Sequence, residues 1–202
     1  MSTVESHAER NVIRVQLTQN LVLKDLTDDE RAALERLLTV VDCGKGDSLL
    51  HQGVTDMEQY FVLDGVLKRV VANPQGKEMI LRFADARDME TSYAAWRLGT
   101  PTPYSIVAVT KTRVAKLPLP QWVAFMEQHP SIKASFEYAV MRLMSEIMAH
   151  TITLHLLDAS GRVNRFMRKH PELAERIPKK ELAAYLNLSA ETLSRLKQRG
   201  KI

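Results

Sequence analysis

The spacing of apolar and polar positions changes along the chain, and its first part predicts helix. A helix is expected over 16–41, where leucines recur among charged residues. Within it, Thr27-Asp28-Asp29-Glu30 has the sequence of a capping box, in which the Thr and Glu side chains bind free backbone N–H groups at a helix start. The apolar side of this helix runs through Leu34, Leu37 and Leu38. We expect it to pack on the segment that follows.

Short alternating apolar runs, interrupted by glycines, fill residues 42–117. This pattern is typical of many short strands joined by tight turns. The clearest strands are expected at 59–63, 66–71, 78–83 and 105–116. Asp64-Gly65 and Asn73-Pro74-Gln75-Gly76 are predicted to be hairpin turns. The spacing suits an antiparallel roll or barrel.

Residues 131–156 contain neither Gly nor Pro and are predicted to form one long helix. A heptad seam, with spacings of four and three, consists of Phe136, Val140, Leu143, Ile147, His150 and Leu154. A second stripe beside it consists of Met144, Met148, Thr151 and His155. One stripe can pack on the strands while the other meets a partner helix, so the seam predicts a parallel homodimer in which polar His150 fixes the register. The alternative is a single broad apolar face packed on one core.

The C-terminal part has the layout of a helix-turn-helix. A short helix is expected over 179–185, a turn over 187–189 and a second helix over 190–198, with Ser189 as its N-cap. Apolar contacts between the two helices are assigned to Leu182, Ala183, Leu186, Leu188 and Leu193. Residues 160–202 carry eleven Lys or Arg and four Asp or Glu, a net of +7, whereas residues 1–159 carry 17 and 20, a net of −3. Positive charge concentrated on one module indicates a phosphate-binding surface.

Polar residues at the start of the second helix are the candidates for base contacts, because that end of a recognition helix enters the major groove. Glu191 can accept from a cytosine amino group, Arg195 can bind guanine with two hydrogen bonds, and Ser194 can contact either kind of base. Ser189 and Thr192 lie beside them. The alternative is that these polar residues only solvate a terminal helix.

Glycines Gly46, Gly53 and Gly65 in the strand region, the long helix and the sequence Glu191-Thr192-Leu193-Ser194-Arg195 together resemble the CRP/FNR family of bacterial transcription regulators. The resemblance covers nearly the whole chain. It implies an α+β fold: an N-terminal antiparallel β-roll of the cyclic-nucleotide-binding, jelly-roll type with flanking helices, a long dimerisation helix and a C-terminal helix-turn-helix. The corresponding ranges are 1–130, 131–158 and 159–202, with a hinge at Ala159-Ser160-Gly161.

The recognition sequence resembles the FNR branch, which implies half-sites like TTGAT. Ala190 stands where the CRP branch has an additional Arg, which argues against TGTGA readout. The chain stops at Gly200-Lys201-Ile202, where many members continue into a β-hairpin wing. Phosphate contacts are therefore assigned to Lys179, Lys180, Lys197 and Arg199.

Family members that bind cyclic AMP hold its phosphate with a Gly-Glu and an Arg-Ser pair, and both are missing from 84–91 and 100–105. Asp85, Asp88 and Glu90 would repel a phosphate, and Arg87 would only partly offset them. No cyclic AMP dependence is therefore expected, although a cyclic-nucleotide-dependent regulator stays an alternative. A pocket for a neutral or aromatic effector is instead assigned to Arg87, Tyr93, Trp96, Tyr104, Met144 and Met148; core packing is the other interpretation.

Composition narrows the class of protein to which the chain can belong. The 202 residues are 45% hydrophobic and 26% charged, as in a soluble globular chain. With one cysteine, Cys43, and no signal peptide or apolar span, the chain is expected in the cytoplasm and away from membranes. No metal site is expected, and heme bound through His51, His129, His150 or His155 is disfavoured. Cys43 is a redox-sensitive thiol only if it is exposed.

These observations predict a homodimeric regulator that binds a pseudo-palindrome in double-stranded DNA, contacts RNA polymerase and is controlled by a small-molecule effector or by none. A second hypothesis makes the roll a ligand-binding regulatory module whose C-terminal helices dock a protein. The sequence contains no nucleophile paired with a base and no phosphate loop, so an enzyme is not expected.

Overall fold

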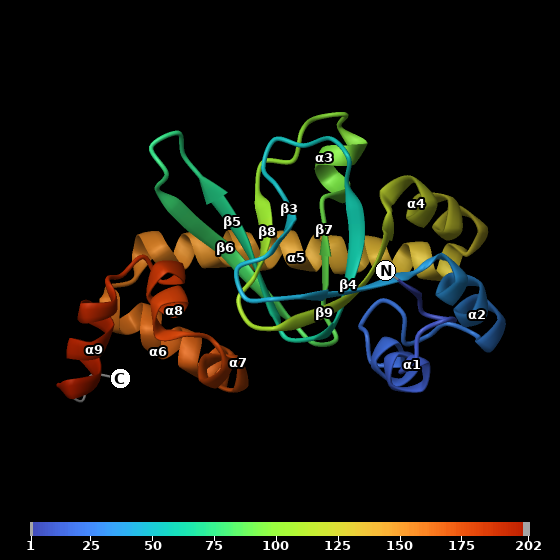
Figure 1. Cartoon of the computed structure of the whole chain (residues 1–202). Helices are drawn as coiled ribbons and strands as arrows, with labels where there is room; N and C mark the ends of the chain where they lie inside the picture. Colours follow the sequence, from blue (N-terminus) through green and yellow to red (C-terminus); the bar gives the residue numbers. More distant parts are fainter. Residues whose placement is uncertain (1, 200–202) are drawn as a thin grey trace.

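A computed structural model describes residues 2–199, and in it two antiparallel sheets are flanked by helices (Figure 1). The strands are β1 (Ser2–Thr3), β2 (Thr39–Cys43), β3 (Ser48–Leu50), β4 (Glu58–Asp64), β5 (Val66–Ala72), β6 (Glu78–Asp85), β7 (Met89–Thr91), β8 (Ser105–Ala108) and β9 (Thr112–Pro118). The helices are α1 (Arg10–Thr18), α2 (Asp28–Leu37), α3 (Tyr93–Arg97), α4 (Leu119–Gln128), α5 (Pro130–Leu156), α6 (Ala159–Lys169), α7 (Pro171–Arg176), α8 (Lys179–Tyr185) and α9 (Ala190–Gln198). The predicted α+β class is confirmed.

The two sheets form the predicted roll. Their strand orders are β1-β2-β9-β4-β7 and β3-β8-β5-β6, and both contribute side chains to one buried cluster that includes Tyr60, Leu67 and Val114. The strands expected at 59–63, 66–71 and 78–83 are confirmed as β4, β5 and β6. The strand expected at 105–116 is wrong, because residues 109–111 separate β8 from β9, which belong to different sheets.

One predicted hairpin turn is confirmed and the other is not. The turn at 73–76 joins the paired strands β5 and β6, and the side chain of Asn73 accepts from the backbone N–H of Gln75 and of Lys77. Asp64-Gly65 instead carries the chain from one sheet to the other, because β4 pairs with β9 and β7. Gly65 has φ +88°, and a Cβ there would lie 2.4 Å from the Lys111 carbonyl oxygen. Only glycine fits this crossing point.

The N-terminal helix prediction is correct at its cap and wrong in extent. Thr27 caps α2 by accepting from the backbone of Glu30, whose side chain accepts from Thr27 in return. The helix does not reach from 16 to 41: α1 ends at Thr18, and residues 39–41 belong to β2. The β-branched residues after Leu38 pair with β9, and this tertiary pairing outweighs the helical spacing of the leucines.

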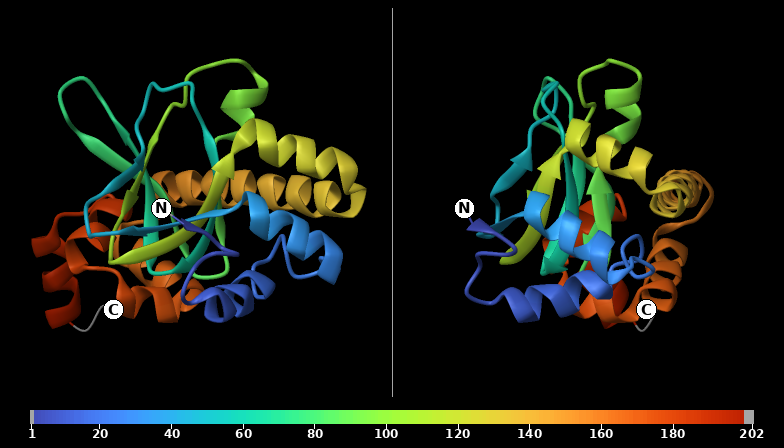
Figure 2. Two further views of the ribbon diagram at one scale, coloured as in Figure 1. Left: turned by 45° about the vertical axis from the view of Figure 1, so that its right-hand side comes forward. Right: turned by 90° about the vertical axis from the view of Figure 1, so that its right-hand side faces the viewer.

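The long helix is confirmed as α5, and it lies along one side of the roll (Figures 1 and 2). Its inner face packs on an aromatic cluster in which the Phe136 ring meets Trp122 at 5.4 Å and Tyr93 at 5.2 Å between centroids. Within residues 2–199, no helix is both long enough and apolar enough to cross a membrane.

The predicted dimer seam is the side of α5 that faces this chain's own core. Phe136 is 0% exposed, Leu143 is buried, and Val140 packs against the same cluster. Ile147 and Leu154 are half-buried. The assignment of Phe136 and Leu143 to a partner helix is therefore wrong: heptad spacing identifies an apolar stripe but does not say what covers it.

Candidate nucleic-acid interface

The C-terminal helices have the predicted boundaries. The first helix is α8 and the second is α9, as expected from their apolar spacing and the Ser189 N-cap, whose side chain accepts from the Thr192 backbone N–H at 3.0 Å. Between them Asn187 has φ +52°, a left-handed conformation that Asn tolerates better than most residues. The Leu188 N–H donates to the Ala183 carbonyl at 2.8 Å, which closes the turn.

Apolar contacts fix the angle between α8 and α9. Leu182, Ala183, Leu186 and Leu193 are buried in one cluster, and Leu188 is packed against it. The same cluster includes Val66 and Val70 of β5 and Ile80 and Phe83 of β6. The helix-turn-helix is thus packed on the end of the roll, and α9 is at the outer edge of the molecule (Figure 1).

The predicted base-contacting residues share the exposed face of α9. The side chains of Glu191 and Arg195 are 78% and 56% exposed, and they lie one turn apart, with 3.8 Å between carboxylate and guanidinium. Ser194 is exposed beside them. Ser189 and Thr192 are bonded to each other in the cap, at 2.9 Å between hydroxyl oxygens, so they position the helix start. The structure brings these residues together on one surface.

The predicted phosphate-contacting residues surround this face. Lys179, Lys180, Lys197 and Arg199 are all exposed, and within residues 2–199 none of them has an ion-pair partner. Lys179, Ser194 and Lys197 line one groove, whose walls come from α6, α7, α8 and α9. The expectation about Gly200, Lys201 and Ile202 lies outside the described residues.

An ion cluster lies inside the roll. It contains acidic residues that, from the sequence, are expected to repel a phosphate. Glu90 is 0% exposed and binds Arg69 of β5 at 2.5 Å and Arg82 of β6 at 2.7 Å. Arg82 also binds Asp88, and Arg69 donates to the Thr91 carbonyl at 3.0 Å. Burial alone would lower the pKa of Arg82, but Asp88 and Glu90 raise it above its ordinary value. The cluster thus combines two arginines with two carboxylates, so its formal charges cancel.

Tyr104 completes this cluster. The Arg69 guanidinium lies 4.1 Å from the centroid of its ring, and its hydroxyl donates to the Thr91 carbonyl at 2.7 Å. Burial raises the pKa of the Tyr104 hydroxyl. Arg69 and Arg82 are functional candidates that the sequence analysis missed, because alternation on a strand predicts which side a residue faces but not its ion partner.

The predicted effector-pocket residues do not converge. Arg87 is exposed on the turn before β7, Tyr93 and Trp96 stack near Phe136, and Tyr104 lies inside the roll. Met144 and Met148 are exposed on α5.

Among the described residues no three or more His, Cys, Asp or Glu gather as a metal site. Cys43 is buried, and burial raises the pKa of its thiol, so it is not the exposed thiol that redox sensing needs.

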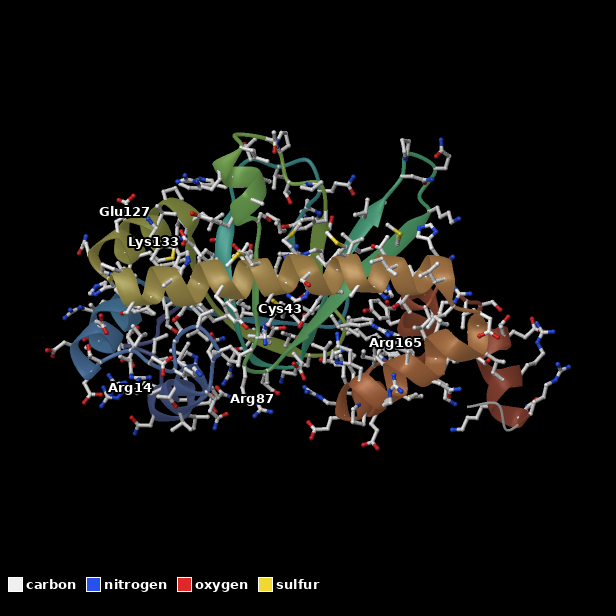
Figure 3. All side chains as sticks on the ribbon, turned by 180° about the vertical axis from the view of Figure 1, so that it is seen from behind. Arg14, Cys43, Arg87, Glu127, Lys133 and Arg165 are labelled. Carbon is white, nitrogen blue, oxygen red and sulfur yellow. The ribbon has the colours of Figure 1, made fainter. Side chains whose placement is uncertain are left out.

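The outer face of α5 exposes a row of apolar side chains. It consists of Tyr138, Met141, Met144, Met148, Ile152 and Leu156, which we call the outer stripe. In the view from behind, no element among the described residues covers this side of α5 (Figure 3). A contiguous apolar stripe of this kind marks an interaction surface.

His150 links α5 to the helix-turn-helix and does not face a partner helix as predicted. Its ring stacks on Tyr185 of α8, with centroids 3.8 Å apart and planes 3° from parallel. Burial lowers the pKa of His150 to about 4, and the positive charge of Lys169 adds to the shift. The packing is therefore fully stable above the ordinary histidine pKa and is weakened as the pH falls towards 4.

We expect acidification from pH 7.5 to 5 to destabilise the contact between α5 and α8 by about 1 kcal/mol, after allowance for partial solvent exposure. Urea unfolding at both pH values measures this loss. In His150→Phe, which keeps a ring on Tyr185, the loss should shrink by this amount, whereas His51→Gln, at an exposed loop position, should behave as the parent. An identical pH dependence in His150→Phe and the parent would contradict the assignment.

Comparisons with known proteins agree with this architecture. Residues 40–129 match the model of the cyclic nucleotide-binding domain. The chain is 21% identical over 159 residues to the cAMP-activated global transcriptional regulator CRP of Salmonella typhimurium, with 74% of this chain and 76% of that protein covered. It is 25% identical over 185 residues to the nitrogen fixation regulation protein FixK of Bradyrhizobium diazoefficiens, with 86% and 76% covered. The solved structure of FixK2 from Bradyrhizobium japonicum superposes with a TM-score of 0.70 at 17% identity, over 81% of this chain and 86% of that one.

Proposed function

Because the chain belongs to the CRP/FNR family of transcription regulators, we propose that it binds DNA as a homodimer and reads a pseudo-palindromic site through α9. The observation that carries the proposal is the exposed group Glu191, Ser194 and Arg195 on the outer side of α9, surrounded by exposed lysines. Two such helices about one helical turn of DNA apart would enter successive major grooves. The half-sites implied by Glu191-Thr192-Leu193-Ser194-Arg195 are like TTGAT.

The experiment for this function is selection of bound duplexes from a random pool by the purified full chain. A DNA-reading dimer should enrich a pseudo-palindrome whose half-sites are centred about 10–10.5 base pairs apart. Recovery of unrelated sequences would favour the second hypothesis, in which the C-terminal helices dock a protein. The protein-docking hypothesis has no specific support in the structure, because the exposed face of α9 is polar and charged. The proposal also includes RNA polymerase as a partner, and this part is supported only by the family of the chain.

We propose that the dimer forms through the outer stripe of α5. A second copy of α5 would cover this stripe well, because the stripe is apolar over most of the helix. In addition, Tyr138, Met141, Met148 and Ile152 keep spacings close to a heptad. Antiparallel or parallel crossing of two such helices would remove these side chains from water. The parallel arrangement brings both α9 helices to the same side, which a palindromic site requires.

Met148→Glu should convert the dimer to a monomer, because Met148 is 65% exposed in one chain and would lie at the centre of the interface. Two buried methionines are lost and two carboxylates are brought together, so the dimer dissociation constant should rise about hundredfold or more. Sedimentation of the full chain measures the change. Met79→Glu, at an exposed methionine of β6, is the matched control and should leave the dimer intact; a dimer in both variants would contradict this interface.

We further propose that the regulator works without a cyclic nucleotide. The support is Glu90, a carboxylate that already engages both interior arginines, so that a phosphate there would have to displace it or meet its repulsion. Calorimetry with cyclic AMP and with cyclic GMP should give no saturable heat at micromolar protein concentrations. Micromolar binding of either nucleotide would overturn the proposal.

A further inference from the structure

A small cavity lies where the roll, the long helix and the C-terminal helices meet. Its volume is about 70 Å³, and its walls come from β6, α5, α6 and α8, with one residue of α7. A water molecule takes about 30 Å³ of liquid, so the cavity has room for about two waters or one small tetrahedral oxyanion. It is separate from the Glu191, Ser194 and Arg195 face of α9, since no residue of α9 lines it.

Unsatisfied nitrogen atoms are concentrated at this cavity. Within residues 2–199, three side chains that line it have a buried nitrogen without a hydrogen-bond partner: Nε of Arg82, Nε of Arg162 and Nε2 of His150. They come from three different elements, β6, α6 and α5. Buried polar atoms in folded proteins nearly always have partners, so the two arginine N–H groups lack an acceptor here, and the His150 ring nitrogen beside them also lacks a partner.

The charges around the cavity are mainly positive. Arg82, Arg162, Arg165 and Lys169 line it, opposed by one lining carboxylate, Glu146. Arg82 is already neutralised by Asp88 and Glu90, but the other three cations have no ion-pair partner in the part of the chain that the structure describes. Arg162 donates through one terminal nitrogen to the Leu186 carbonyl at 2.9 Å, which holds its guanidinium against α8. Arg165 lies between α5 and α6 (Figure 3).

We propose that this cavity binds a phosphate group, either as inorganic phosphate or as the terminal group of a small phosphate monoester. The oxyanion would accept from the guanidinium of Arg162 and from the Nε–H of Arg82, whose terminal nitrogens are already bound to Met89, Glu90 and Asp88, while Arg165 and Lys169 supply charge at the mouth. The helices α6, α8 and α9 belong to one packed unit. An anion bound in the cavity therefore holds this unit against α5. If the proposed function holds, phosphate therefore sets the orientation of the DNA-reading helix.

Calorimetry of the full chain tests the site without DNA. The probes are inorganic phosphate and glycerol 3-phosphate, at an ionic strength held constant with chloride. We expect saturable binding of one anion per chain, with at least one of the probes. Binding of inorganic phosphate identifies the free ion as sufficient, and binding of glycerol 3-phosphate alone identifies a monoester.

Variants of the lining residues locate the site. Arg162→Gln should weaken binding about tenfold or more, because it removes a charge-assisted hydrogen bond, and Arg165→Gln should weaken it up to about fivefold. Glu146→Gln should strengthen it by removing the repelling carboxylate. The matched control is Arg168→Gln, an exposed arginine of α6 that does not line the cavity, and it should bind as the parent. Thermal melting checks that each variant is folded.

Absence of saturable heat with both probes would overturn the proposal. Equal losses in Arg165→Gln and Arg168→Gln would overturn it too, since phosphate would then be attracted to the basic surface in general. If phosphate binds in the expected pattern while no duplex is bound selectively, the site stands and the proposed DNA-reading function fails. If DNA is bound selectively while phosphate does not bind, the DNA-reading function stands and the phosphate site fails.

Discussion

Replacement of Glu90 by alanine should lower the free energy of unfolding of the roll by about 3–5 kcal/mol. The carboxylate of Glu90 is completely buried and is bound by Arg69 and Arg82, both of which are also buried. Without it, Asp88 remains as the single carboxylate bound to Arg82, and Arg69 keeps only its bonds to neutral groups. Loss of one partner from a buried ion cluster costs more than the net contribution of the pair, because the remaining charge is left without compensation.

Urea unfolding at pH 7.5, followed by tryptophan fluorescence, measures this loss, since Trp122 lies in the core beside the roll. Glu127→Ala is the matched control: Glu127 is an exposed carboxylate at the end of α4 and has no ion-pair partner within residues 2–199. It should change stability by less than about 0.5 kcal/mol. Equal unfolding midpoints for the two variants would mean that the ion cluster does not hold the roll together.

Arg195→Ala should cost about 1–3 kcal/mol of specific DNA affinity at each half-site, so about 2–6 kcal/mol for a dimer on a full site. The side chain is exposed on α9 and close to Glu191, so its removal exposes no core and leaves the helix cap intact. Arg195→Lys keeps the positive charge but lacks the planar fork that binds guanine with two hydrogen bonds. We therefore expect it to lose most of the same specificity while retaining nonspecific affinity.

Titration of a labelled site with each variant measures the specific affinity, and titration of a scrambled duplex measures the nonspecific affinity. The matched control is Arg36→Ala, an exposed arginine in the last turn of α2, at the opposite end of the molecule from α9 (Figure 1). It removes the same charge and should leave specificity unchanged. If Arg195→Ala and Arg36→Ala bind the site alike, base reading by Arg195 is contradicted, and the protein-docking hypothesis gains support.

Local signals account for the parts of the fold that the sequence predicts well. The capping box at Thr27, the Ser189 cap and the turn at Asn73 each depend on residues a few positions apart, and each is found where expected. The boundaries of α8 and α9 follow from such signals. The exposed face of α9 follows in turn, because the buried position of Leu193 determines which neighbours point outward.

Tertiary pairing accounts for the failures. The leucine-rich stretch before Thr39 has helical spacing, yet the helix ends there because the residues from Thr39 to Cys43 pair with β9, which no local pattern reveals. Asp64-Gly65 has the sequence of a hairpin turn, but Gly65 lies against Lys111 where the chain crosses between sheets. Phe136 belongs to a heptad, and whether its stripe meets the roll or a partner depends on the position of Trp122. The ion cluster and the phosphate cavity combine residues from distant strands and helices, so spacing along the chain does not predict them.

The most direct test of DNA reading by α9 is fluorescence anisotropy of the purified, ligand-free chain with a TTGAT/ATCAA palindrome and with a scrambled duplex, at two salt concentrations. We expect tighter binding to the palindrome, with affinity for both duplexes falling as salt rises, since exposed lysines and arginines surround the reading face. Equal affinity for the two duplexes at both salt concentrations, with or without phosphate, would contradict sequence-specific recognition by Glu191, Ser194 and Arg195.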